Sequence, residues 1–252
     1  MPLLRTEGIV LQGWDLGEHD RLVTLYTREY GRLAAVARGA RRLRSRFAGA
    51  LELFTWGDAI GFEREGRALV RLDHFDIRQP FRRLREDLER LGQGARMIEA
   101  LARLTAERDA QPLCFALLLR GLRALDADAA PGRVQLAFAL RLLDLLGHRP
   151  RFDRCGRCGR PVGTQGVSFD AAEGSVVCGR CRASGPGLAP PVVAALRGLQ
   201  AASWEARLGA RLAPAVEQAA AAVLDDYLTV LIGAPLRAPR FLAQTRVPRA
   251  QE

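Results

Sequence analysis

The sequence contains no lysine: all 38 basic residues of the 252-residue chain are arginines, set against 28 acidic residues. This absence excludes Schiff-base chemistry, a lysine general base and the lysine of a P-loop. The formal net charge of +10 indicates an anionic partner, most often nucleic acid, because guanidinium groups bind phosphates through paired hydrogen bonds. A GC-rich genome is the other explanation, and it accounts better for the preference for arginine over lysine.

Long apolar runs are missing as well. The most apolar stretch, residues 134–146, is interrupted by Arg141 and Asp144, so no membrane span is expected. The first residues, MPLLRTEG, lack the apolar core of a signal peptide. Five cysteines are too few and too clustered for a disulfide scaffold. We therefore expect a cytoplasmic protein with no membrane partner.

Recognisable catalytic motifs are also lacking. The chain has no Gly-x-Ser-x-Gly elbow, no Walker loop and no His-Glu-x-x-His motif. Asp225 and Asp226 are adjacent on an expected helix and therefore diverge, while Cys114 lies in an apolar run and is predicted to be a core thiol. We expect no enzymatic activity and no small-molecule substrate. The alternatives are a zinc-ribbon nucleic-acid enzyme with a scattered site, or a protein-interaction scaffold.

Four of the cysteines form two Cys-Gly-Arg-Cys knuckles separated by residues 159–177. The ligand set is Cys155, Cys158, Cys178 and Cys181. Two intervening residues let one tight turn direct two thiolates at one metal, and this spacing is typical of a four-thiolate zinc site. We predict one structural Zn²⁺ per chain, with no open position for a catalytic water; two disulfides or four unrelated thiols are the alternative.

Residues 1–80 are predicted to form β-structure. Five short runs, rich in β-branched and aromatic residues, are separated by Gly, Asp and Glu turns: residues 8–14, 21–27, 32–37, 53–62 and 68–77. Five strands in so short a segment favour a small closed barrel, because closure removes the sheet edges. An OB-fold and an SH3-like barrel both fit the pattern.

Helical periodicity begins after Pro80. The apolar positions from Phe81 to Thr105 follow a spacing of three to four, and residues 113–125 and 134–146 are apolar nearly all round, as in buried helices. The period returns at 190–200 and 214–231. The glycine-rich cysteine segment between them is too poor in apolar residues for a core of its own, so a metal would organise it.

The expected fold class is therefore α+β and multidomain: a small β-barrel followed by a helical domain with an inserted zinc finger. The predicted boundaries are 1–80 for the barrel, 81–150 and 185–252 for the two helical parts, and 151–184 for the insertion.

Positive charge is concentrated in one stretch of the barrel. No acidic residue occurs between Glu29 and Glu52, whereas six arginines do: Arg32, Arg38, Arg41, Arg42, Arg44 and Arg46. Such a run on a strand and the following loop predicts a phosphate-binding surface without base specificity; a solvated loop is the alternative. Six aromatic residues of the barrel region could stack on bases, most of them expected in the core, and Tyr30 is the one expected to be exposed.

Several segments resemble the bacterial RecO family of recombination and DNA-repair proteins. These segments are RLVTLYTREYGR (21–32), VARGAR (36–41), Ser45, GALELF (49–54), LLG (145–147) and LRAPR (236–240). The resemblance covers essentially the whole chain. It implies an N-terminal OB-fold, a helical domain and a zinc finger whose ligands map onto the four cysteines, although some relatives have lost them.

The resemblance further implies a non-catalytic, nucleoid-associated role in the RecF pathway. Proteins of this family bind single- and double-stranded DNA and anneal complementary strands. With RecR they load RecA onto strands covered by single-strand DNA-binding protein, whose acidic tail binds in the helical domain. By position, the family's basic barrel surface corresponds to Arg38, Arg41, Arg42, Arg44 and Arg46; the sequence does not place the pocket for the acidic tail.

Overall fold

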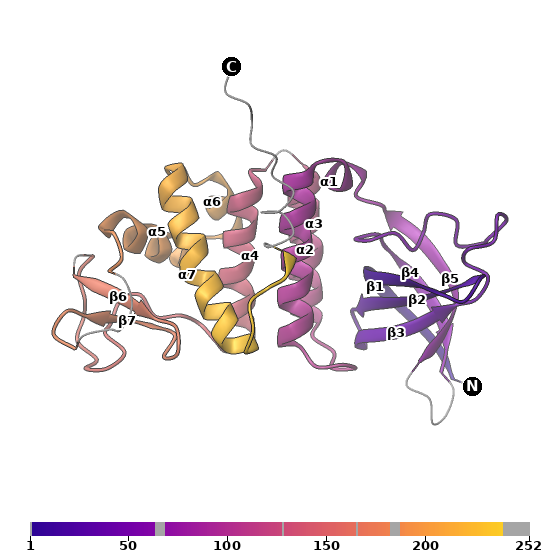
Figure 1. Ribbon diagram of the computed structural model, residues 1–252, viewed down its shortest axis with the longest axis horizontal. Helices are drawn as coiled ribbons and strands as arrows, with labels where there is room; N and C mark the ends of the chain where they lie inside the picture. The colour runs from indigo at the N-terminus through magenta and orange to yellow at the C-terminus, as the bar shows by residue number, and fades with distance from the viewer. Residues whose placement is uncertain (1, 64–68, 128, 165, 182–186, 239–252) are drawn as a thin grey trace, which may run out of the picture. The chain divides into compact units, whose positions relative to one another are not determined.

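The computed structural model describes residues 2–63, 69–127, 129–164, 166–181 and 187–238. The chain divides into two compact units, Met1–Glu86 with Thr105–Asp126 and Asp87–Leu104 with Ala127–Glu252 (Figure 1). Residues 105–126, which lie within the segment 81–150 expected as helical, therefore pack with the barrel. Among the described residues, no helix is long and apolar enough to cross a membrane.

The first unit is built on five strands: β1 (Leu3–Leu16), β2 (Asp20–Thr27), β3 (Gly31–Ala37), β4 (Trp56–Phe62) and β5 (Val70–Gln79). They close into a barrel in the order β1-β2-β3-β5-β4, with β3 and β5 parallel and the other neighbours antiparallel. This connectivity is that of the OB-fold. The predicted barrel is confirmed, and the topology sets aside the SH3-like alternative.

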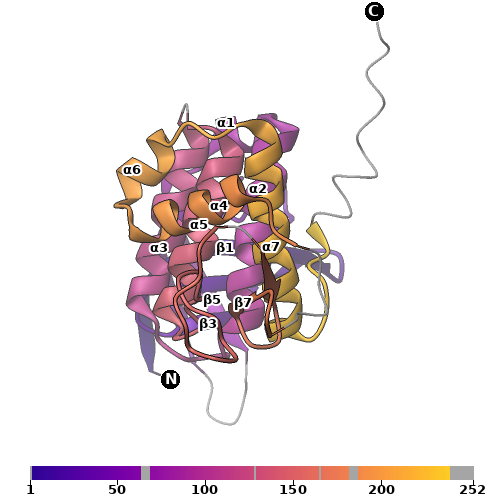
Figure 2. The ribbon, with the colours of Figure 1, turned by 90° about the vertical axis from the view of Figure 1, so that its left-hand side faces the viewer.

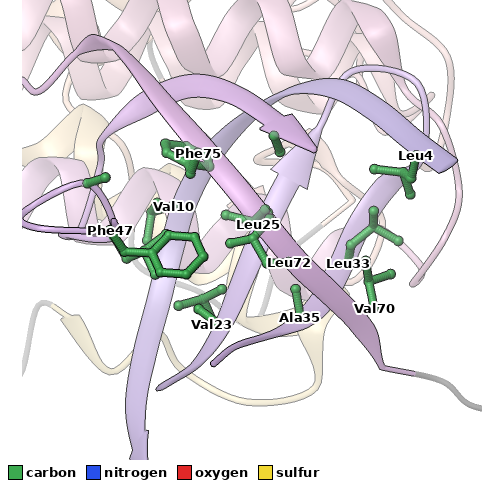
Figure 3. Close-up of a cluster of buried hydrophobic side chains, with 14 residues drawn as sticks. Leu4, Val10, Val23, Leu25, Leu33, Ala35, Phe47, Val70, Leu72 and Phe75 are labelled. Carbon is green, nitrogen blue, oxygen red and sulfur yellow. The ribbon is translucent and has the colours of Figure 1, made fainter. Parts of the chain in front are cut away.

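The barrel core is a cluster of buried side chains contributed by all five strands (Figure 3). Phe47 joins it from the connection between β3 and β4, with its side chain only 2% exposed and close to Val10 and Val23 in the view. Ala50 and Leu51 of the same connection are also buried. Because complete burial of one such phenylalanine contributes about 1.5–3 kcal/mol to folding, this packing holds the connection against the barrel.

Strand β1 pairs with two partners, and a bulge makes this possible. Its first half pairs with β4, its second half pairs with β2, and the register shifts between Val10 and Gln12. A bulge adds one residue and bends the strand, which lets β1 curve around the barrel. In a regular strand, residues an even number of positions apart face the same side of the sheet, and the extra residue breaks this rule. Leu4 and Val10 point into the core, yet Trp14, four positions after Val10, points outward and is 45% exposed.

Helices α1 (Arg82–Glu86) and α3 (Pro112–Asp126) complete the first unit. They are joined by a hydrogen bond at 3.0 Å from the Leu84 amide to the Asp126 carboxylate. The prediction of a buried helix over residues 113–125 is confirmed, since Leu118 and Leu122 are fully buried. Cys114 is buried as well, and burial raises the pKa of its thiol, as expected for a core cysteine.

The second unit contains α2 (Leu88–Leu104), α4 (Pro131–Leu145), α5 (Pro190–Ala201), α6 (Trp204–Gly209) and α7 (Pro214–Ile232). Proline begins α4, α5 and α7, where its missing N–H is not needed by the helix. Both α5 and α6 pack on α4 (Figure 2). The helical spacing from Phe81 to Thr105 is divided between α1 and α2, because the Asp87 carboxylate caps the Arg90 amide at 2.9 Å and starts a new helix.

A buried arginine ties these helices together. Arg207 of α6 is only 8% exposed, and its guanidinium donates to the carbonyls of Leu199, Gln200 and Ala137 at 2.6, 3.1 and 3.4 Å. Burial lowers its pKa. The three carbonyl acceptors compensate for the lost hydration of the guanidinium, so this short helix, which the periodicity of the sequence does not reveal, is firmly attached.

Candidate nucleic-acid interface and four-cysteine site

The arginine segment, residues 38–46, is held to the barrel at both ends. At its start, the Gly39 amide donates to the Asp20 carboxylate at 2.8 Å, and the Arg41 amide donates to the His19 carbonyl at 3.0 Å. At its end, Phe47 enters the barrel core. Gly39 has φ +68°, a conformation that glycine adopts without strain. The segment is therefore an ordered ridge that follows β3 and presents its long side chains to solvent.

The five arginines of this segment are of two kinds. Arg38, Arg42 and Arg44 are exposed, and within the described ranges their guanidinium groups have no hydrogen-bond or ion-pair partner. Arg41 instead pairs with Asp15 at 3.1 Å and donates to the Gly17 and Glu18 carbonyls at 2.8 and 3.2 Å.

Arg46 is likewise engaged. It pairs with Asp73 at 3.1 Å, and its guanidinium lies 5.2 Å from the ring centroid of Phe47. Arg41 and Arg46 thus fix the segment on its neighbouring strands, whereas the charges of the other three arginines have no compensating partner in the part of the chain that the structure describes.

Two predicted site residues lie elsewhere. Arg32 is at the opposite end of β3, about 20 Å from Arg38 along the strand at 3.3 Å per residue. Its guanidinium turns toward Glu107 at 3.7 Å, and its Nε is buried. Tyr30, 37% exposed, belongs to the turn at that same end. The structure therefore gathers five of the predicted residues and separates these two from them.

The aromatic residues of the barrel region have varied environments. Tyr26 and Phe54 are fully buried, and burial raises the pKa of Tyr26. Trp56 is covered by two guanidinium groups, those of Arg78 and Arg123, at 5.2 and 4.8 Å from its ring. Trp14 is more exposed than Tyr30. Sequence reasoning missed its exposure because the bulge in β1 changes which residues face outward.

The four predicted metal ligands converge. The Sγ atoms of Cys155, Cys158, Cys178 and Cys181 all lie within 4.8 Å of one another, and those of Cys158 and Cys178 are 3.9 Å apart. All four cysteines are free thiols. A tetrahedral site with metal–sulfur bonds of about 2.3 Å requires sulfur–sulfur separations of about 3.8 Å. The residues therefore fit a four-thiolate metal ion, and the two-disulfide alternative is set aside.

Local backbone geometry builds each half of this site. The first knuckle closes with the Gly159 amide on the Cys155 carbonyl at 2.9 Å, and the second with the Cys181 amide on the Cys178 carbonyl at 2.9 Å. Between them lies a hairpin, β6 (Val167–Asp170) and β7 (Ser175–Cys178), which the glycine-rich sequence did not predict. The hairpin ends at a ligand and thereby sets the spacing between the knuckles.

Hydrogen bonds to sulfur prepare the site for a cation. The Cys178 amide donates to the Cys155 Sγ at 3.4 Å, which lowers the pKa of the Cys155 thiol to about 6. Hydrogen bonds with the sulfurs of Cys158 and Cys178 raise the pKa of Cys181 to about 12, because a thiol that donates to neighbouring sulfur keeps its proton. A bound metal ion would take the place of this proton and compensate the negative charge of the four sulfurs.

The cysteine segment is attached to the helical unit by packing as well as by its own turns. Phe152, Phe169 and Tyr227 of α7 form a chain of ring contacts at 5.7 and 5.8 Å. Arg197 of α5 donates to the carbonyls of Phe152 and Val162 at 2.8 and 2.7 Å. Figure 1 shows β6 and β7 beside these helices. The cysteine segment thus packs against side chains of α5 and α7 instead of forming a core of its own. Its sequence alone does not reveal this support.

Arg157 belongs to this structural framework. Its guanidinium donates to the Cys181 carbonyl at 3.0 Å and pairs with Asp170 and Glu173 at 3.1 and 3.4 Å. Arg180, within the second knuckle, is exposed, and Arg182 lies outside the described residues. Arg157 therefore links the knuckles to the hairpin.

Other polar clusters in the described ranges do not assemble a reactive group. The ligand-type cluster found there is that of the four cysteines. Asp225 pairs with the largely buried side chain of Arg96, whereas Asp226 is exposed, so these two carboxylates diverge as predicted. A cavity of about 450 Å³ in the helical unit is lined by Arg96 and Arg133 among others, and Arg133 lies 3.9 Å from Glu217. The positive charges of the cavity are thus matched by carboxylates.

Fold and site together define a class of protein: an OB-fold protein with an arginine-rich surface, continued by a helical domain that carries four clustered cysteines able to hold a metal ion. Comparison with known families refines this class. Residues 1–81 match the family described as "Recombination protein O N terminal", and residues 85–240 match "Recombination protein O C terminal". The chain belongs to the RecO family of recombination and DNA-repair proteins.

Individual relatives are similar over nearly the whole chain. The chain is 40% identical over 245 residues to the DNA repair protein RecO of Anaeromyxobacter sp. (strain K), covering 96% of both chains. It is 40% identical over 238 residues to that of Myxococcus xanthus (strain DK1622), covering 94% of this chain and 96% of the relative. These similarities support a role in DNA recombination and repair.

Proposed function

We propose that this protein is a non-catalytic mediator of recombinational repair that binds single- and double-stranded DNA and anneals complementary strands. The observation that carries the proposal is a group of three exposed guanidiniums, those of Arg38, Arg42 and Arg44, on an ordered ridge of the OB-fold; no described residue pairs with them. Annealing requires two polyanions to approach each other. Arginines that neutralise phosphates lower this repulsion without reading bases.

The two paired arginines have a supporting role in this proposal. Arg41 and Arg46 hold the segment through Asp15 and Asp73, and they add charge at its edges. Because carboxylates partly compensate these two, most of the electrostatic attraction falls to the unpaired three. Arg32 and Tyr30, at the far end of β3, lie outside the proposed interface.

We further propose the partners that family membership suggests. Together with RecR, the protein helps to load RecA onto strands covered by single-strand DNA-binding protein, and it acts in the cytoplasm at the nucleoid. The support is the match of both halves of the chain to the recombination protein O family.

For the four cysteines we propose one structural Zn²⁺ per chain. Four thiolates saturate a tetrahedral zinc and leave no site for water, so the ion would hold the two knuckles together. The packing of buried Phe152 and the hydrogen bond from Arg197 to its carbonyl would then transmit this order to the helices.

The decisive experiment is a salt titration of DNA binding with the triple variant Arg38→Ala/Arg42→Ala/Arg44→Ala. Each lost phosphate contact should flatten the slope of log affinity against log salt by about 0.7 for single strands and about 0.9 for duplex. The loss should be uniform across DNA sequences.

The matched control removes three other exposed arginines, Arg5, Arg82 and Arg211. An unchanged slope in the first variant, or an equal change in both, would reject the interface. Cleavage or base modification of DNA on addition of divalent metal would instead favour the enzyme alternative. If the protein bound an acidic peptide at this segment but had no affinity for DNA, the scaffold alternative would be favoured.

A further inference from the structure

The outer surface of β1, β2 and β3 carries a row of apolar side chains. Residues directly opposite each other in antiparallel strands share a face, and successive residues of one strand alternate between faces. Trp14 pairs with Leu22, and Leu22 pairs with Val36. Val23, Leu25 and Leu33 point into the core, so Leu22 and Val36 point outward with Trp14.

Half of this outer face is already covered within the barrel unit. At one end, Tyr26 is fully buried and Arg32 lies against Glu107, because the segment that leads into α3 packs there. The other end is open. Trp14 is 45% exposed and Leu16 is 43% exposed, while Leu22 and Val36 are half-buried.

The open end adjoins the arginine segment. Arg38 follows β3 two residues after Val36 and is exposed on the continuation of the strand. Arg41 donates to the carbonyls of Gly17 and Glu18 in the turn between β1 and β2, so the segment lies close to the turn that follows Trp14. An aromatic and aliphatic surface is thus bordered by uncompensated positive charge.

This juxtaposition fits one polymer better than others. A single strand of DNA exposes both phosphates and the faces of its bases, whereas a duplex hides its base faces in the stack. Base stacking on aromatic side chains next to a basic groove is the way in which sequence-independent single-strand binders gain affinity. A protein helix would match the apolar row but would leave the arginines unpaired.

We propose that Trp14, supported by Leu22 and Val36, is a base-stacking platform that gives this surface its preference for single-stranded DNA. The proposal rests on the proposed DNA-binding function and deepens it. Arg38, Arg42 and Arg44 hold phosphates of any strand, and the Trp14 row distinguishes unpaired bases from paired ones.

The test compares Trp14→Ala and Trp14→Phe with the unmodified protein on three probes of equal charge: oligo-dT, an abasic oligonucleotide of the same length, and a hairpin duplex. Trp14→Ala should weaken oligo-dT binding between about fivefold and 150-fold, the range for loss of one stacked base. Affinity for the abasic strand and the duplex should stay within about twofold. Trp14→Phe keeps an aromatic ring and should retain most of the affinity.

Tyr30→Ala is the matched aromatic control at the covered end of the same face, and it should bind oligo-dT like the unmodified protein. Unchanged oligo-dT binding by Trp14→Ala would overturn the proposal. Equal loss on the abasic probe would also overturn it, as would equal loss in Tyr30→Ala. Binding of a protein partner, with no effect on any DNA probe, would show that the row serves protein recognition.

Fluorescence supplies a second readout. The chain has three tryptophans, and stacking on a base should quench Trp14 when oligo-dT is added, but not when the abasic strand is added. Trp14→Phe should lose this quenching, while Trp56 and Trp204 remain as internal references. Persistent quenching in Trp14→Phe would contradict the proposal.

The proposed stacking platform and the proposed DNA interface can be rejected separately. If the triple arginine variant flattens the salt slope but Trp14→Ala changes nothing, the stacking platform is wrong and the DNA interface stands. If the arginine variant has no effect, the proposed interface itself is wrong.

Discussion

The carboxylate of Asp20 accepts a hydrogen bond from the amide of Gly39 at 2.8 Å. This contact joins the first residue of β2 to the start of the arginine segment, and Gly39 can take part because its φ of +68° suits glycine. Nineteen positions separate the two residues along the chain. The placement of Arg38 and Arg42 on either side of Gly39 therefore depends on a partner from another strand.

Replacement of Asp20 tests this anchor. Asp20→Ala removes the acceptor and leaves the Gly39 amide without it, so we expect a loss of about 1 kcal/mol in the free energy of unfolding and weaker DNA binding. Asp20→Asn keeps an oxygen acceptor and should lie close to the unmodified protein. Urea unfolding and fluorescence anisotropy with labelled DNA measure both effects; equal behaviour of the two variants would contradict the role of the hydrogen bond.

A pair of glycine substitutions tests how closely the segment before α3 packs on the barrel. Gly31 and Gly17 have nearly equal φ, +64° and +62°, but a Cβ on Gly31 would lie 2.0 Å from the Asp109 carbonyl, whereas one on Gly17 would meet nothing within 4 Å. Gly17→Ala should cost about 1 kcal/mol, the strain of alanine at positive φ. Gly31→Ala should cost more, because the segment around Asp109 must move. Chemical denaturation compares the two, and equal costs would contradict this packing.

Alkaline pH should lower the free energy of unfolding through the buried phenol of Tyr26. Burial raises its pKa in the folded state, so above pH about 10 the unfolded chain loses this proton while the folded protein keeps it. The unfolded state is then favoured, and the free energy of unfolding should fall by up to about 1.4 kcal/mol per pH unit from this group. Tyr26→Phe should lessen the fall by that amount. Urea titrations between pH 9 and 11.5 measure it, and identical slopes in both proteins would show that Tyr26 does not titrate on unfolding.

Metal removal should act locally. We expect about one zinc per chain by elemental analysis, and chelation should increase amide exchange in residues 151–181 while the barrel stays protected, because the clustered thiolates then repel one another. Cys155→Ser should behave in the same way. If chelation abolished DNA binding with the barrel still folded, the metal would have a direct role in the interface instead of a structural one.

Much of the fold follows from local pattern. Alternation predicts the five strands, proline at the helix starts is consistent with α4, α5 and α7, and the two-residue gaps of the knuckles bring Cys155 and Cys158 together by turn geometry alone. The two gaps predict a four-thiolate site even though the hairpin between them is not visible in the sequence. Short-range geometry carries these predictions, so no distant partner is needed.

The binding surface could be predicted only in part. The run of arginines is plain in the sequence, but the ion pairs of Arg41 with Asp15 and of Arg46 with Asp73 join residues 26 and 27 positions apart. The outward direction of Trp14 depends on a single extra residue in the bulge of β1. Pairing across the barrel and register are properties of the closed sheet, which no local period contains.

The sequence by itself determined the elements and the chemistry available: a charged run with no acid between Glu29 and Glu52, two cysteine knuckles, and strands long enough to close a barrel. Tertiary structure alone decided which arginines of residues 38–46 pair with carboxylates of other strands, and that Trp14 faces outward. The reason is physical: side-chain identity sets what a group can bind. Whether a group is free to bind depends on neighbours that the fold brings from distant parts of the chain.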